Sequence, residues 1–147
     1  MPKPEGQLTA AQFEILSIIW EQGRGGATIG EIWQVISTRR SVARTTVLNL
    51  VDRLEKRGWL RRQDGEGVQR YLAGVSRAEA ERRLARGFLN DFFGDRRLQA
   101  VRSLLGTGAY DEDELRELRD LVDRALEEDG EGSARGSKAR RRRGGER

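Results

Sequence analysis

The sequence predicts a mainly α-helical fold with one small β-hairpin, arranged as a winged helix-turn-helix domain followed by a helical dimerisation arm. Three amphipathic segments separated by short turns fill residues 8–58, which is the pattern of a helix-turn-helix core. Two strand-like runs then flank a turn that contains Asp64-Gly65, and this is a hairpin signal directly after the third helix. Helical periodicity returns later in the chain. We therefore expect a winged-helix domain at 1–75, a helical dimerisation region at 76–128 and a disordered basic tail at 129–147.

The first predicted helix has a complete start signal. Thr9 is placed to cap it, and Gln12 completes a capping box three residues later. Leu8 is placed to pack on Phe13 as a hydrophobic staple, and Gly23 ends the helix. Helical spacing predicts a buried stripe made of Phe13, Leu16, Ile19 and Trp20.

The second predicted helix repeats this arrangement. Thr28 is the expected cap, with Glu31 at the third helical position. Its inward-facing side chains are expected to be Ile32, Trp33 and Ile36.

The third segment, residues 41–60, predicts an amphipathic helix with a basic outer face. Apolar side chains recur at helical spacing on its inner face, and Gly58 is a natural left-handed end; the inner residues are Val47, Leu50, Val51 and Leu54. An outer face that mixes Arg, Thr and Asn suits a helix in the DNA major groove, where Arg reads guanine and Asn reads adenine. A solvated basic surface helix remains the alternative. The outer residues are Arg44, Thr45, Thr46, Leu48, Asn49, Asp52, Arg53 and Lys56.

The hairpin after this helix predicts a basic wing. The two strands are expected at residues 59–62 and 68–72. Arg61, Arg62 and Arg70 are then placed for phosphate contacts, which position a protein on DNA without reading its sequence. A generic surface hairpin is the alternative.

The second half of the chain predicts helices that need a partner. Its apolar residues form narrow stripes flanked by charge, and too few of them remain to build an independent core of normal size. We interpret the stripes as a dimerisation surface, with packing inside one chain as the alternative. The residues concerned are Leu84, Phe88, Phe92, Leu115, Leu118, Val122 and Leu126.

Composition excludes several classes of function. The chain contains no Cys and no His, so it lacks sulfur nucleophiles, thiolate metal ligands and the usual general base. No phosphate-binding loop or nucleophile elbow is present, and we expect neither an enzyme nor a bound metal or cofactor. No apolar stretch is long enough to span a bilayer, and we expect a cytoplasmic protein without membrane insertion.

The charges are distributed unevenly. Residues 1–75 carry 11 basic and 8 acidic side chains, a net charge of +3, whereas residues 76–129 carry 10 and 14, a net charge of −4. Residues 130–147 carry 7 and 2, a net charge of +5. A basic first half beside an acidic second half indicates a nucleic-acid-binding domain joined to a region that stays off the phosphates.

Taken together, these segments resemble the penicillinase-repressor family of bacterial winged-helix regulators, which includes the methicillin-resistance repressor and the copper-responsive repressors. The resemblance covers about Leu8 to Glu127 and rests on LTAAQFEILSIIW, TTVLNLVDRLEKRGWL, Tyr71, FFGD and DEDELRELRDLV. It implies a homodimeric repressor that binds double-stranded DNA, with Tyr71 in the DNA-binding wing. The cysteine-rich end of the copper branch is missing, so the likeness to that branch is confined to the DNA-binding half.

The resemblance also implies a regulatory partner. The chain departs from the family pattern at two positions. In the antibiotic-responsive branch, a membrane sensor protease cuts an Asn-Phe bond before the last helix, and this position corresponds to Ser103-Leu104 here. The wing turn of the family opens with Gly-Arg, where this chain has Glu66-Gly67-Val68.

Three other functions are alternatives to a sequence-specific repressor. A small-molecule-responsive winged-helix regulator of the multiple-antibiotic-resistance type would need a polar-lined pocket, which no sequence feature marks. An enzyme would have to rely on carboxylates, Lys or Ser alone. A non-specific architectural protein would use the basic run at 138–143 and would show no preferred DNA site.

Overall fold

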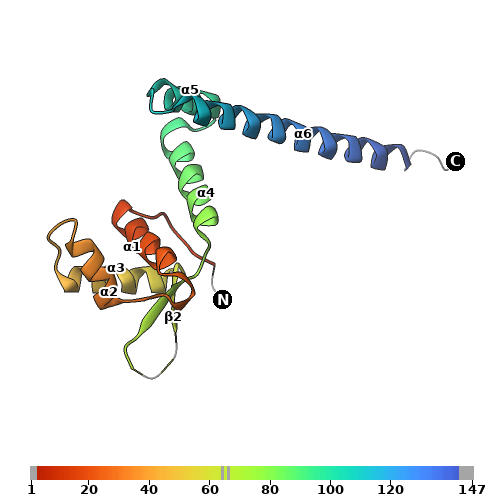
Figure 1. Cartoon of the computed structure of the whole chain (residues 1–147). Helices are drawn as coiled ribbons and strands as arrows, with labels where there is room; N and C mark the ends of the chain where they lie inside the picture. Colours follow the sequence, from red (N-terminus) through yellow and green to blue (C-terminus); the bar gives the residue numbers. More distant parts are fainter. Residues whose placement is uncertain (1–2, 64, 66, 143–147) are drawn as a thin grey trace. The chain divides into compact units, whose positions relative to one another are not determined.

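The structure, a computed structural model, is mainly helical with one small antiparallel sheet and confirms the winged-helix fold class (Figure 1). It describes residues 3–63, 65 and 67–142. The chain forms two compact units, Met1–Arg97 and Leu98–Arg147, and each is described by itself. The elements of the first unit are α1 (Ala10–Glu21), η1 (Gly23–Gly25), β1 (Ala27–Thr28), α2 (Ile29–Ser37), α3 (Arg44–Lys56), β2 (Leu60–Gln63), β3 (Arg70–Ala73), α4 (Arg77–Phe88) and η2 (Leu89–Phe93).

Helix α1 begins as predicted and is buried more widely than predicted. The backbone N–H of Gln12 donates to Thr9 Oγ1 at 3.2 Å, and Gln12 Oε1 accepts from the backbone N–H of Thr9 at 3.1 Å. The predicted stripe is partly wrong, because Phe13 and Trp20 are only half-buried. Helix α1 contacts α2, α3 and β3, so a broad arc of it is covered. The fully buried residues are Ile15, Leu16, Ile18 and Ile19.

Helices α2 and α3 form the predicted helix-turn-helix. Thr28 Oγ1 accepts from the backbone N–H of Glu31 at 3.1 Å and caps α2. Helix α3 ends at Arg57, and Gly58 follows with φ of +81°, the left-handed conformation that favours glycine. The inner face of α3 is as predicted, with Val47, Val51 and Leu54 buried and Leu50 half-buried.

The wing is part of a three-stranded sheet. Strands β2 and β3 pair antiparallel, with Leu60 opposite Ala73 and Gln63 opposite Arg70. Strand β1, which was not predicted, pairs with β3 on its other side to give the order β1-β3-β2. This third strand ties the wing to the start of α2.

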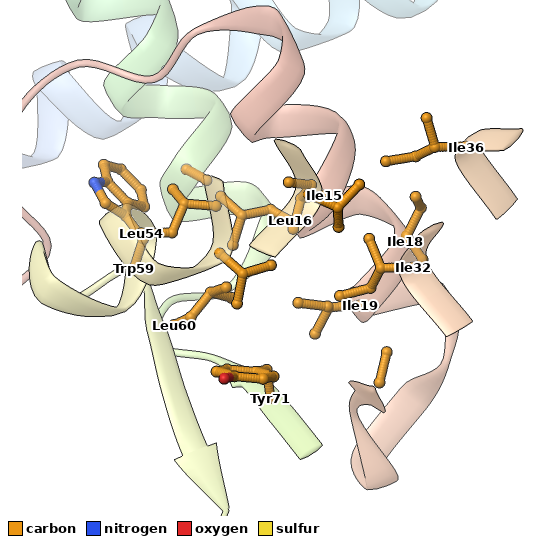
Figure 2. Close-up of a cluster of buried hydrophobic side chains, with 14 residues drawn as sticks. Ile15, Leu16, Ile18, Ile19, Ile32, Ile36, Leu54, Trp59, Leu60 and Tyr71 are labelled. Carbon is orange, nitrogen blue, oxygen red and sulfur yellow. The ribbon is translucent and has the colours of Figure 1, made fainter. Parts of the chain in front are cut away.

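One hydrophobic core unites these elements. Figure 2 shows side chains from α1, α2, α3 and the sheet converging on one cluster. Trp59 and Leu60, at the start of the wing, are 1% and 2% exposed, so the wing is attached to the core through its first residues. Removing a large buried side chain of this kind costs about 3–5 kcal/mol.

Helix α4 belongs to the first unit rather than starting the second. Ser76 caps it by accepting from the backbone N–H of Glu79 at 3.2 Å. Ala80 is fully buried and joins the core cluster, which places the first turn of α4 in the domain. The compact unit Met1–Arg97 includes α4 and η2.

The second unit contains α5 (Arg97–Gly106), which starts at the boundary, and α6 (Glu112–Arg142). A capping box opens α6: the backbone N–H of Glu114 donates to Asp111 Oδ1, and that of Asp111 to Glu114 Oε2, both at 2.9 Å. Helix α6 continues to Arg142, whereas disorder was expected from residue 129. This segment contains no Pro and several helix-forming Ala, Glu, Lys and Arg residues. Residues 143–147 of the predicted tail lie outside the described residues.

Each helix in the described part of the chain is too short or too polar to cross a lipid bilayer.

Candidate nucleic-acid interface

The outer face of α3 is open to solvent, as the sequence predicts. Seven of the eight predicted residues are exposed and Asp52 is half-buried. Asn49 lies in the middle of this face, and Arg44 lies at the first position of the helix. The exposed residues are Arg44, Thr45, Thr46, Leu48, Asn49, Arg53 and Lys56.

Arg44 is supported from below by α2. Its guanidinium lies over the Trp33 ring, 6.0 Å from the centroid. Trp33 Nε1 donates to the backbone carbonyl of Val42 at 3.0 Å, so the same indole fixes the turn before α3. A Cβ on Gly30 would lie 3.0 Å from Arg44 Nη2, which shows how closely the arginine approaches the bare backbone. Helical spacing predicts Trp33 only as an inward-facing residue and gives no sign of this second role.

Carboxylates neutralise several of the cations near this face. Lys56 Nζ lies 2.9 Å from Asp52 Oδ2 within α3. In the turn before α3, Arg40 and Arg39 reach Glu14 of α1 at 2.7 and 3.3 Å. These two arginines lower the pKa of Glu14, mainly through the hydrogen bond from Arg40, against the opposing effect of burial.

Two cations of α3 have no such partner. Within the part of the chain that the structure describes, no carboxylate forms an ion pair with Arg44 or Arg53. An unpaired guanidinium keeps its five donors available for base edges or phosphate oxygens.

Alternation along β2 sends Arg61 and Arg62 to opposite faces of the sheet. Arg62 Nη2 lies 3.1 Å from Glu55 Oε2, so it lies on the side of α3. Arg61 lines a surface hollow with Trp20 and Val75, on the side of α1. The two arginines therefore lie on opposite faces of the wing, and the phosphate contact predicted for each stays a prediction.

Arg70 and Tyr71 have structural roles that the prediction of DNA contact did not foresee. Arg70 donates from Nε to the carbonyl of Gly25 at 3.0 Å and pairs with Glu31 at 3.2 Å, which ties β3 to the start of α2. Tyr71 is 4% exposed and lies in the core, with Arg62 over its ring at 5.8 Å from the centroid. We therefore expect Arg70 and Tyr71 to support the wing, although the DNA contacts predicted for them stay predictions.

The predicted dimerisation residues are divided between the two units. In the first unit, Phe88 and Phe92 are exposed and Leu84 is half-buried. On α6, Val122 and Leu126 are 59% and 65% exposed, Leu115 is also exposed and Leu118 is half-buried. On α5 and α6, five further exposed apolar residues were not predicted: Leu98, Val101, Leu104, Leu105 and Leu121. Those on α5 are spaced at helical intervals, which is the signal that could have found them.

The described residues contain no cluster of three or more potential metal-ligating side chains. The first unit contains a cavity of about 220 Å³ between residues 6–8, Trp59 and the face of α4 and η2 that carries Phe88 and Phe92. Its polar side chains are already hydrogen-bonded to the protein: Gln7 to Asp91, and Arg83 to the carbonyl of Pro4. We assign no ligand to it.

Comparison with known proteins identifies the family of the chain. The family model described as "Penicillinase repressor" matches residues 8–124. The penicillinase repressor of Staphylococcus aureus is 24% identical over 122 residues, covering 83% of this chain and 95% of the relative. The methicillin resistance regulatory protein MecI of Mammaliicoccus sciuri is 22% identical over 118 residues, covering 80% and 94%.

Two solved structures are also similar. The Bacillus licheniformis BlaI monomeric form in complex with the blaP half-operator has a TM-score of 0.45 and 22% identity, covering 54% of this chain and 93% of that one. A MarR family protein from Bacillus stearothermophilus has a TM-score of 0.44 and 22% identity, covering 82% and 74%. The assignment rests on the family model, which spans most of the sequence: this chain belongs to the penicillinase repressor family, whose members are DNA-binding transcriptional repressors and not enzymes.

Proposed function

We propose that this DNA-binding transcriptional repressor acts in the cytoplasm as a homodimer on a near-palindromic operator. The observation that carries the proposal is the exposed outer face of α3, which presents Asn49 together with the unpaired guanidiniums of Arg44 and Arg53. Two such helices in successive major grooves would cover the operator and exclude the polymerase.

The chemistry of the face indicates a division of roles within each half-site. Asn49 is suited to bidentate hydrogen bonds with adenine and Arg44 to guanine, while Leu48 offers an apolar contact for a thymine methyl group. Arg53, Lys56 and the hydroxyls of Thr45 and Thr46 are suited to phosphates. In the wing, Arg61 and Arg62 are the remaining candidates for phosphate contacts, one from each face of β2.

The exposed apolar residues of the second half support a dimer. Helix α6 presents Leu115, Leu121, Val122 and Leu126 to solvent in a single chain. Helices with an uncovered apolar stripe of this kind pair with another helix, because the pairing removes that surface from water. A second copy of the same chain would supply the matching stripe through a two-fold axis.

Selection of binding sites from random-sequence duplexes tests the proposal directly. We expect the full-length protein to enrich two inverted half-sites whose centres lie one or two helical turns apart, about 10–21 base pairs. Hydroxyl-radical footprinting of the selected site should then show protection related by two-fold symmetry, with two chains per duplex. Enrichment of a single unrepeated half-site bound by one chain would contradict the homodimer, and the absence of any enriched sequence would favour a non-specific architectural protein.

A further inference from the structure

The first residues of the described chain form a strap that is hydrogen-bonded to the end of α3, the proposed recognition helix. We use "strap" for residues 4–8. The backbone N–H of Glu5 donates to the carbonyl of Arg57 at 2.9 Å. In return, the Arg57 guanidinium donates to the carbonyls of Glu5 at 3.2 Å and Gln7 at 2.7 Å. Trp59 Nε1 donates to the same Glu5 carbonyl at 2.9 Å.

The other side of the strap is bound to the segment that leads out of the domain. Arg83 of α4 donates from Nη1 to the carbonyl of Pro4 at 2.6 Å. Gln7 Nε2 donates to Asp91 Oδ2 of η2 at 3.0 Å. The guanidinium of Arg83 also lies over the Trp59 ring, 5.5 Å from its centroid. The strap therefore joins two segments that are otherwise far apart in sequence.

Close packing contributes little to this junction. Beyond its first turn, where Ala80 enters the core, α4 packs closely on η2, which follows it directly, and only sparsely on the other helices and strands among the described residues. A cavity of about 220 Å³ separates Trp59 and the strap from the apolar face of α4. With so little apolar contact, the angle at which α4 leaves the domain depends on the two polar links from the strap.

We propose that the strap is a positioning device which fixes the direction of α4 relative to the recognition helix and so selects the half-site spacing of the operator. The inference rests on the proposed homodimer, in which each DNA-binding domain is connected to its dimerisation helices through α4. With a rigid connection, the second recognition helix of a bound dimer stays near one position, so only one operator spacing places the second half-site within its reach. With a hinged connection, that helix samples many positions and accepts many spacings. Arg83, Asp91 and Gln7 act here as positioning residues and make no contact with DNA.

The chain offers closely matched variants for a test. Arg83→Met combined with Asp91→Ala removes both links from α4 and η2 to the strap. The control is Arg82→Met combined with Asn90→Ala. Arg82 pairs with Glu79 at 2.9 Å, as Arg83 does at 3.2 Å. Arg82 and Asn90 are both exposed, and neither is hydrogen-bonded to the strap among the described residues. Asp91→Asn is the conservative rescue, because its amide oxygen can still accept from Gln7.

Full-length variants are titrated on a single half-site and on operators in which the selected spacing is changed by up to five base pairs. We call Arg83→Met with Asp91→Ala the strap variant. We expect it to bind the single half-site with the same affinity as the control. On the operator with the preferred spacing its affinity should fall about tenfold, and its affinities for the different spacings should become more alike. Asp91→Asn should keep the sharp preference. A strap variant with an unchanged spacing preference would overturn the inference, and so would one with weakened half-site binding, since the strap would then support the recognition helix itself.

The proposed function fails in a different way in the same experiment. If the control protein binds paired half-sites no more tightly than a single one, the homodimer is contradicted before the strap variant is considered.

Discussion

In the proposed DNA complex, Asn49 is the side chain on which recognition of the base sequence depends most directly. It lies at mid-helix on the exposed face of α3, and its amide can both donate to and accept from an adenine edge. We expect Asn49→Ala to cost about 1–3 kcal/mol on the selected operator and to change binding to random DNA little. Competition titrations with both duplexes measure the difference. Equal losses on the two DNAs would assign Asn49 a positioning role.

Arg53→Ala is the natural comparison, because Arg53 is exposed on the same helix and unpaired among the described residues. A phosphate contact should weaken both DNAs alike and reduce the salt slope by about one.

Glu14 makes the stability of the domain sensitive to acid. Arg40 and Arg39 lower its pKa in the folded protein, so the ion pair stabilises the fold above the ordinary glutamate pKa and is lost as pH falls through the depressed value. We expect Glu14→Gln to lower the free energy of unfolding by about 1 kcal/mol at neutral pH. The difference from the parent protein should shrink on acidification.

Urea denaturation at a series of pH values measures this effect. Glu21→Gln, at an exposed position of the same helix, is the control. A difference between the Glu14 variant and the parent that grows as pH falls would have the wrong sign for this ion pair.

At the scale of elements, the wing is held by one arginine and offers another to solvent. Arg70 joins β3 to the carbonyl of Gly25 and to Glu31, so Arg70→Met should cost about 1–2 kcal/mol of stability and leave the salt slope of DNA binding unchanged. Arg61→Met should do the reverse, with unchanged stability and a slope lowered by about one. Thermal unfolding and salt titration of both variants separate the two roles. A lowered slope for Arg70→Met would restore it as a phosphate contact.

Helix α5 bears on whether a membrane sensor protease can act on this chain. The bond that corresponds to the family's cleavage position, Ser103-Leu104, lies inside α5, and a helical bond must be locally unwound before a protease can bind it in extended form. Ser-Leu also replaces Asn-Phe at this position. We therefore expect the chain to stay intact when such a sensor is co-expressed and activated, as measured by immunoblot. A fragment that ends between Ala100 and Gly106 would contradict this expectation.

Local signals in the sequence predicted the elements well, and long-range contacts limited the rest. The caps at Thr9 and Thr28 and the end of α3 at Gly58 depend only on neighbouring residues, and the sequence predicts all three. The strand β1 was missed because two residues carry too little pattern. The buried state of Ile15 and Ile18 was missed because three elements cover α1 from different sides.

The sequence predicts which side chains of the candidate site are exposed, but not which residues they contact. Exposure of the outer face of α3 follows from helical periodicity alone. Arg70 and Tyr71 could not be assigned in this way, because their contacts come from residues about 40 positions away and from the core. The strap was invisible to the sequence for the same reason, since Gln7 meets Asp91 across 84 positions.

At the scale of the whole molecule, charge and apolar surface are separated along the chain. Residues 1–75 carry a net charge of +3 and residues 76–129 a net charge of −4. The exposed apolar residues of α5 and α6 lie in the acidic part, which phosphates repel. In the proposed homodimer, this separation would let one part of the chain bind DNA while the other binds a second copy.

The dimer makes the sharpest prediction at this scale. Val122 and Leu126 lie on one face of α6 and are 59% and 65% exposed in the single chain, so aspartates at both positions stay hydrated in a monomer. In a dimer that covers this face, each carboxylate would be buried without a partner. We expect Val122→Asp with Leu126→Asp to yield a folded monomer that binds a single half-site normally and the full operator about 100-fold more weakly.

Arg124→Asp is the control. It changes the net charge by the same amount on the opposite side of the helix, given 3.6 residues per turn, and this variant should remain dimeric. Sedimentation velocity at micromolar concentration and operator titration decide the matter: a parent protein that sediments as a monomer, or a double variant that stays dimeric, would show that this face of α6 does not hold the two chains together.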